Sequence, residues 1–200
     1  MGRPRGFDEV AVLDASVGQF RVYGFADTTT EQLCVAAGVR RSSLYNTFVS
    51  KDELFVRSLE RSVSLIREQL EAVLTSPGRS GIERLEALFS SILEEEAEAR
   101  KEGHAAGCMI VASRMAPDLG AREPRVQRIL DRFHDYHLSL VTGAVRIGRG
   151  DGSLRADVTP GDAALAIVSA TFGMRVLSQS GATLDELRRV ADLHLDSVRA

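Results

Sequence analysis

Residues 24–55 have the sequence GFADTTTEQLCVAAGVRRSSLYNTFVSKDELF, and this stretch decides the fold of the N-terminal part of the chain. Thr29 is followed three residues later by Gln32, which is the pattern of a capping box at a helix start. Gly38 ends this short helix, because glycine readily adopts the left-handed conformation of a C-terminal cap. A second short helix fits residues 41–48. Two short helices joined by so tight a turn predict a helix-turn-helix.

The second of these helices has one apolar and one polar side. Leu44 and Phe48 are four residues apart, so both point to the same buried face. In a helix-turn-helix the second helix enters the major groove of DNA and the first crosses the backbone. The polar side therefore supplies candidate DNA contacts, whereas an ordinary helical hairpin would leave it in solvent. These candidates are Ser42 and Asn46, the flanking Ser43 and Tyr45, Arg40 and Arg41 at the start of the helix, and Lys51 at the start of the next.

Two arginines near the N-terminus form a second candidate DNA-binding feature. Arg3 and Arg5 lie in the short segment Gly2-Arg3-Pro4-Arg5. Arms of this kind can enter the minor groove beside a recognition helix, where the negative potential is strongest over narrow A·T tracts. The alternative is a terminus whose two arginines are solvated.

The whole chain has the composition of a globular helical protein. It has 200 residues, of which 44% are hydrophobic and 26% charged, and this is enough apolar material for a sizeable core. The net charge of −3 does not by itself indicate a nucleic-acid partner, so the placement of the basic residues carries that argument. No stretch approaches the roughly 18 apolar residues of a membrane span, and the N-terminus lacks an apolar signal core. We therefore expect a soluble, cytoplasmic protein.

Apolar residues recur at helical spacing along the chain, and no alternating strand pattern is convincing. We therefore expect an all-α protein of about nine helices. The fourth helix is long and links two domains. We place a helix-turn-helix DNA-binding domain with its N-terminal arm at residues 1–55, and a helical effector-binding and dimerisation domain at residues 56–200. Pro117 is expected to end the sixth helix.

The motifs of the opening stretch closely resemble those of the tetracycline-repressor-like (TetR) family. The matching segments are Gly24-Phe25-Ala26-Asp27-Thr28-Thr29, Ala37-Gly38-Val39, Leu44-Tyr45-Asn46-Thr47-Phe48 and Ser50-Lys51-Asp52-Glu53-Leu54-Phe55. The resemblance covers about residues 8–56. It implies an all-α homodimer that acts as a sequence-specific transcription factor, usually a repressor that a small molecule releases from DNA. By motif position it places DNA contacts at Thr29, Arg41, Ser42, Ser43, Tyr45, Asn46 and Lys51.

Two positions depart from the pattern of that family. Arg40 stands where the family often has Ser or Thr, and Ser42 stands where it often has Gly. Arg40 cannot cap the following helix as Ser would, while Ser42 adds a possible contact to a base or a phosphate. The operator sequence therefore cannot be taken from relatives. A helical ligand-binding protein that has lost DNA binding stays an alternative.

The C-terminal part holds candidate effector-binding residues. The segment Gly107-Cys108-Met109-Ile110 resembles a subgroup of electrophile-responsive repressors, in which a cysteine after Gly at the start of the sixth helix is the sensor. This implies an alternative function, electrophile or redox sensing through Cys108, whereas a buried cysteine would simply pack as a small hydrophobe. His137, on the apolar stripe of a long helix, would either orient a ligand or form a hydrogen-bonded core histidine. We place an effector of unknown identity among Cys108, Met109, Phe133, His137, Val141 and Phe172.

Small residues on the helix expected near 162–178 allow another helix to approach closely. With the last helix, near 184–198, this helix would form a four-helix interface in a homodimer, although packing within one chain is the alternative. A two-fold dimer suits a palindromic double-stranded DNA operator, since each recognition helix reads one half-site. The small residues are Ala163, Ala166, Ala170 and Gly173.

A rival class of function, an all-α enzyme or metal-binding bundle, rests on three residues. Asp131, His134 and His137 are spaced by three, but such steps drift around a helix and no second cluster of ligands accompanies them. Paired Glu-x-x-His motifs, a phosphate-binding glycine loop and a nucleophile elbow are all missing from the sequence. We therefore expect no enzymatic activity, no cofactor, no metal and no membrane partner.

Overall fold

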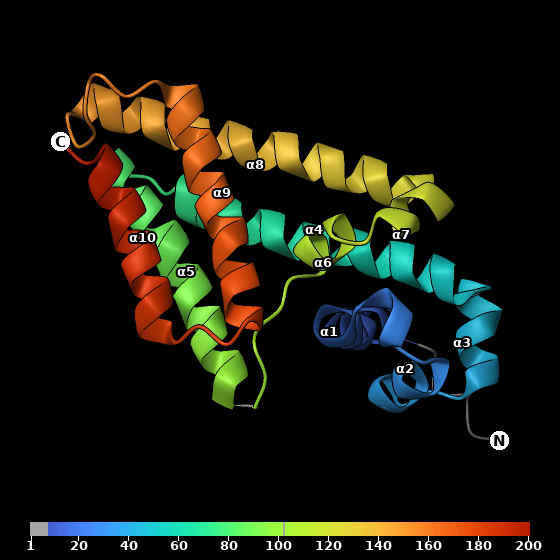
Figure 1. Cartoon of the computed structure of the whole chain (residues 1–200). Helices are drawn as coiled ribbons and strands as arrows, with labels where there is room; N and C mark the ends of the chain where they lie inside the picture. Colours follow the sequence, from blue (N-terminus) through green and yellow to red (C-terminus); the bar gives the residue numbers. More distant parts are fainter. Residues whose placement is uncertain (1–7, 102) are drawn as a thin grey trace.

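The computed structural model describes residues 8–101 and 103–200, which form ten α-helices and no strand. Figure 1 shows α1 to α3 (blue) at one end of α4, and α5, α9 and α10 gathered at its other end. The all-α fold predicted from the sequence is confirmed. In chain order the helices are α1 (Glu9–Asp27), α2 (Thr30–Ala37), α3 (Arg41–Phe48), α4 (Lys51–Leu74), α5 (Gly81–Lys101), α6 (Met109–Arg114), α7 (Pro117–Arg122), α8 (Pro124–Asp151), α9 (Pro160–Gln179) and α10 (Leu184–Val198).

Local signals set the ends of α2 and α3 as the sequence predicts. The Thr29 hydroxyl accepts a hydrogen bond from the Gln32 backbone N–H, and the Thr29 backbone N–H donates to Gln32 Oε1 at 2.7 Å. Gly38 follows α2 with a φ of 64°, the left-handed conformation of a glycine cap. Leu44 and Phe48 of α3 are both buried. The capping box, the turn and the buried face of the second helix are therefore confirmed.

The first helix, α1, continues to Asp27, because Gly24 kinks it without ending it. Gly24 has a φ of 71°, a conformation that glycine adopts without the steric cost of a Cβ atom. Beyond the kink, the Phe25 ring makes an edge contact with the ring of Phe55, with 5.0 Å between their centroids. The kink thereby joins the end of α1 to the core around the start of α4.

The long helix α4 packs against both parts of the molecule. Ser50 caps its first turn, since its hydroxyl accepts from the Glu53 backbone N–H at 3.0 Å. Its N-terminal half lies on α1, where Arg61 forms an ion pair with Asp14 at 2.7 Å. Its C-terminal half contributes buried leucines to the core that includes α8. The division that we propose near residue 55 therefore falls within one continuous helix.

One short helix, α7, is missing from the prediction. We expected a break at Pro117, but this residue begins α7. Proline has no backbone N–H to donate, and the first residue of a helix needs none, so proline is compatible with a helix start. A second proline, Pro124, begins α8 in the same way. No helix within the described ranges combines the length and the apolar character that a bilayer span requires.

The substitution Gly81→Ala is expected to destabilise the fold by about 2 kcal/mol, because α5 begins in backbone contact with α8. A Cβ atom on Gly81 would lie 2.2 Å from the Cα atom of Gly148. Gly143→Ala is the matched control: nothing lies within 4 Å of its added Cβ, so it should stabilise α8 by roughly 0.5–1 kcal/mol. Urea denaturation followed by circular dichroism measures both. If Gly81→Ala matched the wild type, the contact between α5 and α8 would not be tight.

Candidate functional site

The outer face of α3 is a short polar surface. Ser42 and Asn46 are exposed, as are Arg40 and Arg41 at the start of the helix. Arg40 makes no side-chain hydrogen bond to the first turn of α3, as expected for an arginine in place of a capping Ser. The four side chains therefore face solvent together, and their amide, hydroxyl and guanidinium groups are those that recognise base edges and phosphates.

Tyr45 differs from these residues because it also braces the two helices. Its hydroxyl lies 3.1 Å from the hydroxyl of Thr30 in α2, and its ring is half-buried. The Arg41 guanidinium lies 5.6 Å from the centre of the same ring. Tyr45 thus fixes α3 against α2 while it remains at the edge of the polar surface, so a substitution there would alter both orientation and contact.

The other candidate contacts surround this surface. Thr29 is exposed, but its hydroxyl is occupied by the capping box of α2. Ser43 is half-buried on the flank of α3. Arg3 and Arg5 lie outside the described residues, so the expected contact with the minor groove stays a prediction.

Lys51 lies over an aromatic ring at the start of α4. Its Nζ atom is 4.4 Å from the centre of the Phe25 ring, and the guanidinium of Arg122 in α7 is 4.6 Å from that centre. Burial lowers the pKa of Lys51, and Arg122 adds to this effect, while the carboxylate of Asp52 opposes it. Arg122 is itself paired with Asp52 at 3.2 Å. The expected phosphate contact at Lys51 therefore lies directly beside a contact between the two parts of the chain.

Comparison with known proteins agrees with the geometry of α2 and α3. The sequence profile of the family described as "Bacterial regulatory proteins, tetR family" matches residues 12–57. The chain is 27% identical over 199 residues to the HTH-type transcriptional repressor ComR of Escherichia coli, which covers 95% of this chain and 88% of ComR. Residues 12–57 form a domain of the TetR family. The chain is a DNA-binding transcriptional regulator of the helix-turn-helix type.

Solved structures of TetR regulators share this fold over most of the chain. A TetR-family regulator from Agrobacterium tumefaciens matches with a TM-score of 0.84 at 14% identity, covering 95% of this chain and 96% of that one. A cysteine mutant of the TetR-family regulator CifR, complexed with 26-bp double-strand operator DNA, matches with a TM-score of 0.75 at 25% identity. That match covers 98% of this chain and 99% of the CifR chain.

The structure brings together four of the six residues expected to bind the effector. Cys108, Phe133, His137 and Phe172 line one cavity of about 60 Å³ between α4, α5, α6, α8 and α9. Met109 and Val141 are buried but do not line this cavity. The other lining residues, which the sequence did not single out, are Ile66, Gln69, Leu70, Leu88, Ser91, Ile92, Ile110, Thr171 and Arg175.

His137 is a buried histidine without a hydrogen-bond partner. It is 4% exposed, and neither ring nitrogen bonds to any described residue. Its ring packs between Phe133 and Phe172, at centroid distances of 5.7 Å and 5.9 Å. Burial lowers the pKa of His137 to about 4, with a smaller contribution from His134. Among the described residues His137 has no partner for the hydrogen bond that a core histidine would form, and its contact with an effector stays a prediction.

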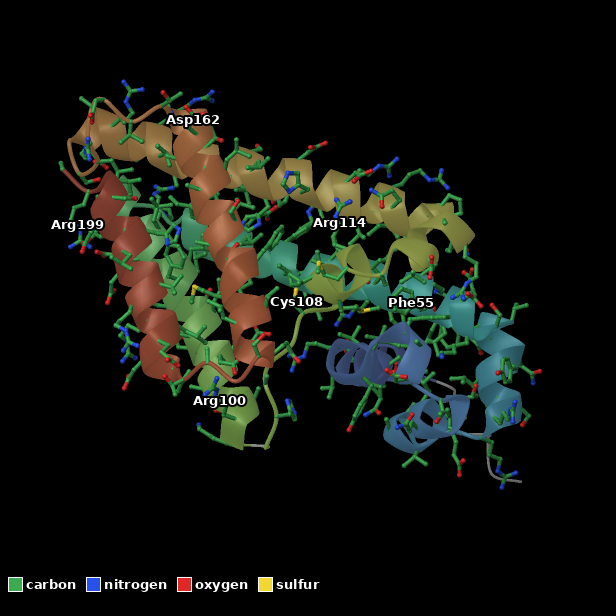
Figure 2. All side chains as sticks on the ribbon, viewed as in Figure 1. Phe55, Arg100, Cys108, Arg114, Asp162 and Arg199 are labelled. Atoms are coloured by element: carbon green, nitrogen blue, oxygen red, sulfur yellow. The ribbon has the colours of Figure 1, made fainter. Side chains whose placement is uncertain are left out.

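Cys108 and Arg114 lie at opposite ends of α6, and both are labelled in Figure 2. The guanidinium of Arg114 donates to Asp131 of α8 at 2.8 Å, so this carboxylate is its described partner. Cys108 is half-buried and lines the cavity as well as two neighbouring surface clefts. Electrophile sensing at Cys108 stays a prediction.

The three residues behind the metal-binding alternative do not converge. Asp131 is exposed and bonded to Arg114 and Gln127, whereas His137 is buried in the cavity wall. Within the described residues, no group of three or more His, Cys, Asp or Glu side chains is placed to hold a metal ion. The relatives of the chain are transcriptional regulators.

Sequence reasoning missed a group of charges at the junction of the two parts. Arg21 of α1 donates to Glu95 of α5 at 3.0 Å, and Arg175 of α9 donates to the other oxygen of the same carboxylate. These partners are separated by 74 and 80 residues in the chain. No local pattern connects residues so far apart, so only the tertiary structure shows the group.

Proposed function

We propose that the protein is a repressor that a small-molecule effector releases from DNA. The observation that carries this proposal is the path of α4. Its first turn follows directly after the recognition helix α3, and Ile66, Gln69 and Leu70 near its other end line the cavity. A ligand that widens the cavity would push on the same rigid helix that positions α3.

Two ion pairs connect the first turn of α4 to α7 and α8. Glu53 in the first turn of α4 is paired with Arg125 of α8 at 2.8 Å, next to the pair of Asp52 and Arg122. A displacement of α7 or α8 would therefore move the first turn of α4, which directly follows α3. Release requires that the effector binds one arrangement of the helices more tightly than the other, because equal affinity for both shifts nothing.

We propose a homodimer formed by α9 and α10. The outer face of α9 exposes apolar residues at helical spacing, and Leu193 of α10 is 70% exposed. The small residues expected at this interface divide between two faces: Ala163 and Ala170 are buried within the chain, whereas Ala166 is exposed and Gly173 half-buried. Such a dimer places two copies of α3 on one palindromic operator in the cytoplasm. The exposed apolar residues of α9 are Leu165, Val176 and Leu177.

Selection of duplexes from a random DNA pool tests the proposal. The purified protein without effector is expected to enrich a palindromic site and to bind it far more tightly than scrambled DNA at moderate salt. Binding by charge alone would show no sequence preference and would fall steeply with salt. If a folded dimer enriched no site, operator recognition without a co-repressor would be refuted.

A further inference from the structure

Arg175 stands where the cavity meets a cleft at the protein surface. The cleft has a volume of about 200 Å³ and shares Ile66, Gln69, Cys108 and Arg175 with the cavity. It also contains Arg21 and Glu95. The backbone beside Cys108 passes close to both domains here, since a Cβ on Gly107 would lie 2.5 Å from the Arg21 carbonyl oxygen of α1.

The charges at this junction do not balance. Glu95 accepts from Arg21 through one oxygen and from Arg175 through the other. Two guanidinium groups thus share one carboxylate, and the group carries a net positive charge. The side chains are largely shielded from water, with exposed fractions of 31% for Arg21, 30% for Glu95 and 14% for Arg175.

Each arginine also has a buried N–H group without an acceptor. Arg21 Nε and Arg175 Nη1 are inaccessible to solvent and bond to no described residue. A buried donor that lacks a partner is costly, and the cost is larger for a charged group. Carboxylates match the planar donor arrangement of a guanidinium group. An added carboxylate would therefore supply acceptors for the unpaired N–H groups of both arginines.

The cavity beside Arg175 is mostly apolar and has an aromatic wall. Phe133, His137 and Phe172 form one wall, and His137 is neutral at pH 7 because burial lowers its pKa to about 4. Its ring nitrogens can donate or accept one further hydrogen bond without adding charge. At about 60 Å³ the cavity has room for about two water molecules, so a larger group enters only if lining side chains rotate.

We propose that Arg21 and Arg175 bind the carboxylate of a small acidic molecule whose apolar part enters the cavity beside Phe172. The regulatory part of this inference rests on the proposed function. It adds the chemical class of the effector. The carboxylate accepts from the N–H groups that Glu95 leaves unpaired, Arg21 Nε and Arg175 Nη1, and its charge balances the group. Because Arg21 belongs to α1, binding alters the contact between the DNA-binding part and α5.

Isothermal titration calorimetry with paired probes tests the site. The probes are 3-phenylpropanoate and the straight-chain carboxylates of four to ten carbons, each compared with its uncharged amide. At least one carboxylate is expected to bind with a Kd below about 1 mM, and its amide at least ~10-fold more weakly. Arg175→Gln should weaken the carboxylate ~10-fold or more, while Arg175→Lys keeps the charge and loses less. Arg188→Gln, at an exposed arginine of α10, is the matched control and should leave binding unchanged.

Three outcomes would overturn the site: equal binding of acid and amide, no binding of any carboxylate to the folded protein, or full binding by a folded Arg175→Gln variant. Thermal melts establish that each variant is folded. Fluorescence anisotropy with the selected operator separates this inference from the proposed function. Operator binding in a protein that binds no carboxylate would refute only the acidic effector. A carboxylate that binds at Arg175 but does not change operator affinity would refute the regulatory link and retain the site.

Discussion

Asn46→Ala is expected to weaken binding of the selected operator by about 100-fold and to relax the base preference at one position of each half-site. Asn46 is exposed on the outer face of α3, opposite the buried Leu44 and Phe48. An asparagine that bonds a base edge in the major groove contributes about 1–3 kcal/mol. A symmetric dimer loses that contact twice, which gives the expected effect. Fluorescence anisotropy on the operator and on single-base variants measures both changes.

Two arginine variants separate base reading from charge. Arg41→Ala is expected to weaken operator and scrambled DNA alike and to reduce the slope of affinity against salt, as for a phosphate contact. Arg132→Ala removes the same charge from an exposed position on α8, away from α3, and should change neither quantity. If Asn46→Ala kept the affinity and base preference of the wild type, α3 would not be the helix that reads the operator.

The candidate DNA-binding surface follows from signals within about twenty residues of sequence. The Thr29 and Gln32 side chains cap the start of α2, and Gly38 ends it. These effects act between neighbouring residues, so the sequence alone reveals them. The spacing of Leu44 and Phe48 then fixes which side of α3 faces outward. Local chemistry therefore predicts the candidate recognition surface, and the family resemblance agrees with it.

The connection between the two parts of the molecule has no such signal. The sharing of Glu95 by Arg21 and Arg175 depends on how α1, α5 and α9 meet. The place of Arg122 over Phe25 depends in the same way on α7, a helix that the sequence pattern did not reveal. Periodicity identifies buried positions but not their partners, so cavity walls and ion pairs between distant helices need the folded structure.

The buried state of His137 predicts a loss of stability in mild acid. In the folded protein its pKa is lowered from 6.5 to about 4, while the unfolded chain titrates near the ordinary value. Above pH 6.5 both states are neutral at this residue. As the pH falls below 6.5, His137 becomes protonated in the unfolded state, whereas in the folded state it stays neutral until about pH 4. The free energy of unfolding should therefore decrease by about 2 kcal/mol between pH 7.5 and 5, and by about 3 kcal/mol near pH 4.

The substitution His137→Leu should remove this pH dependence, since leucine fills an apolar cavity wall and binds no proton. Urea denaturation at pH 7.5 and 5 measures the free energy of unfolding for the wild type and the variant. His194→Gln is the matched control, because His194 is half-buried on α10 and bonds to the Val190 carbonyl oxygen at 2.8 Å, outside the cavity. It should keep the wild-type decrease. If His137→Leu lost as much stability in acid as the wild type, the proton would bind elsewhere, and the unpartnered nitrogens of His137 could not be the origin of the effect.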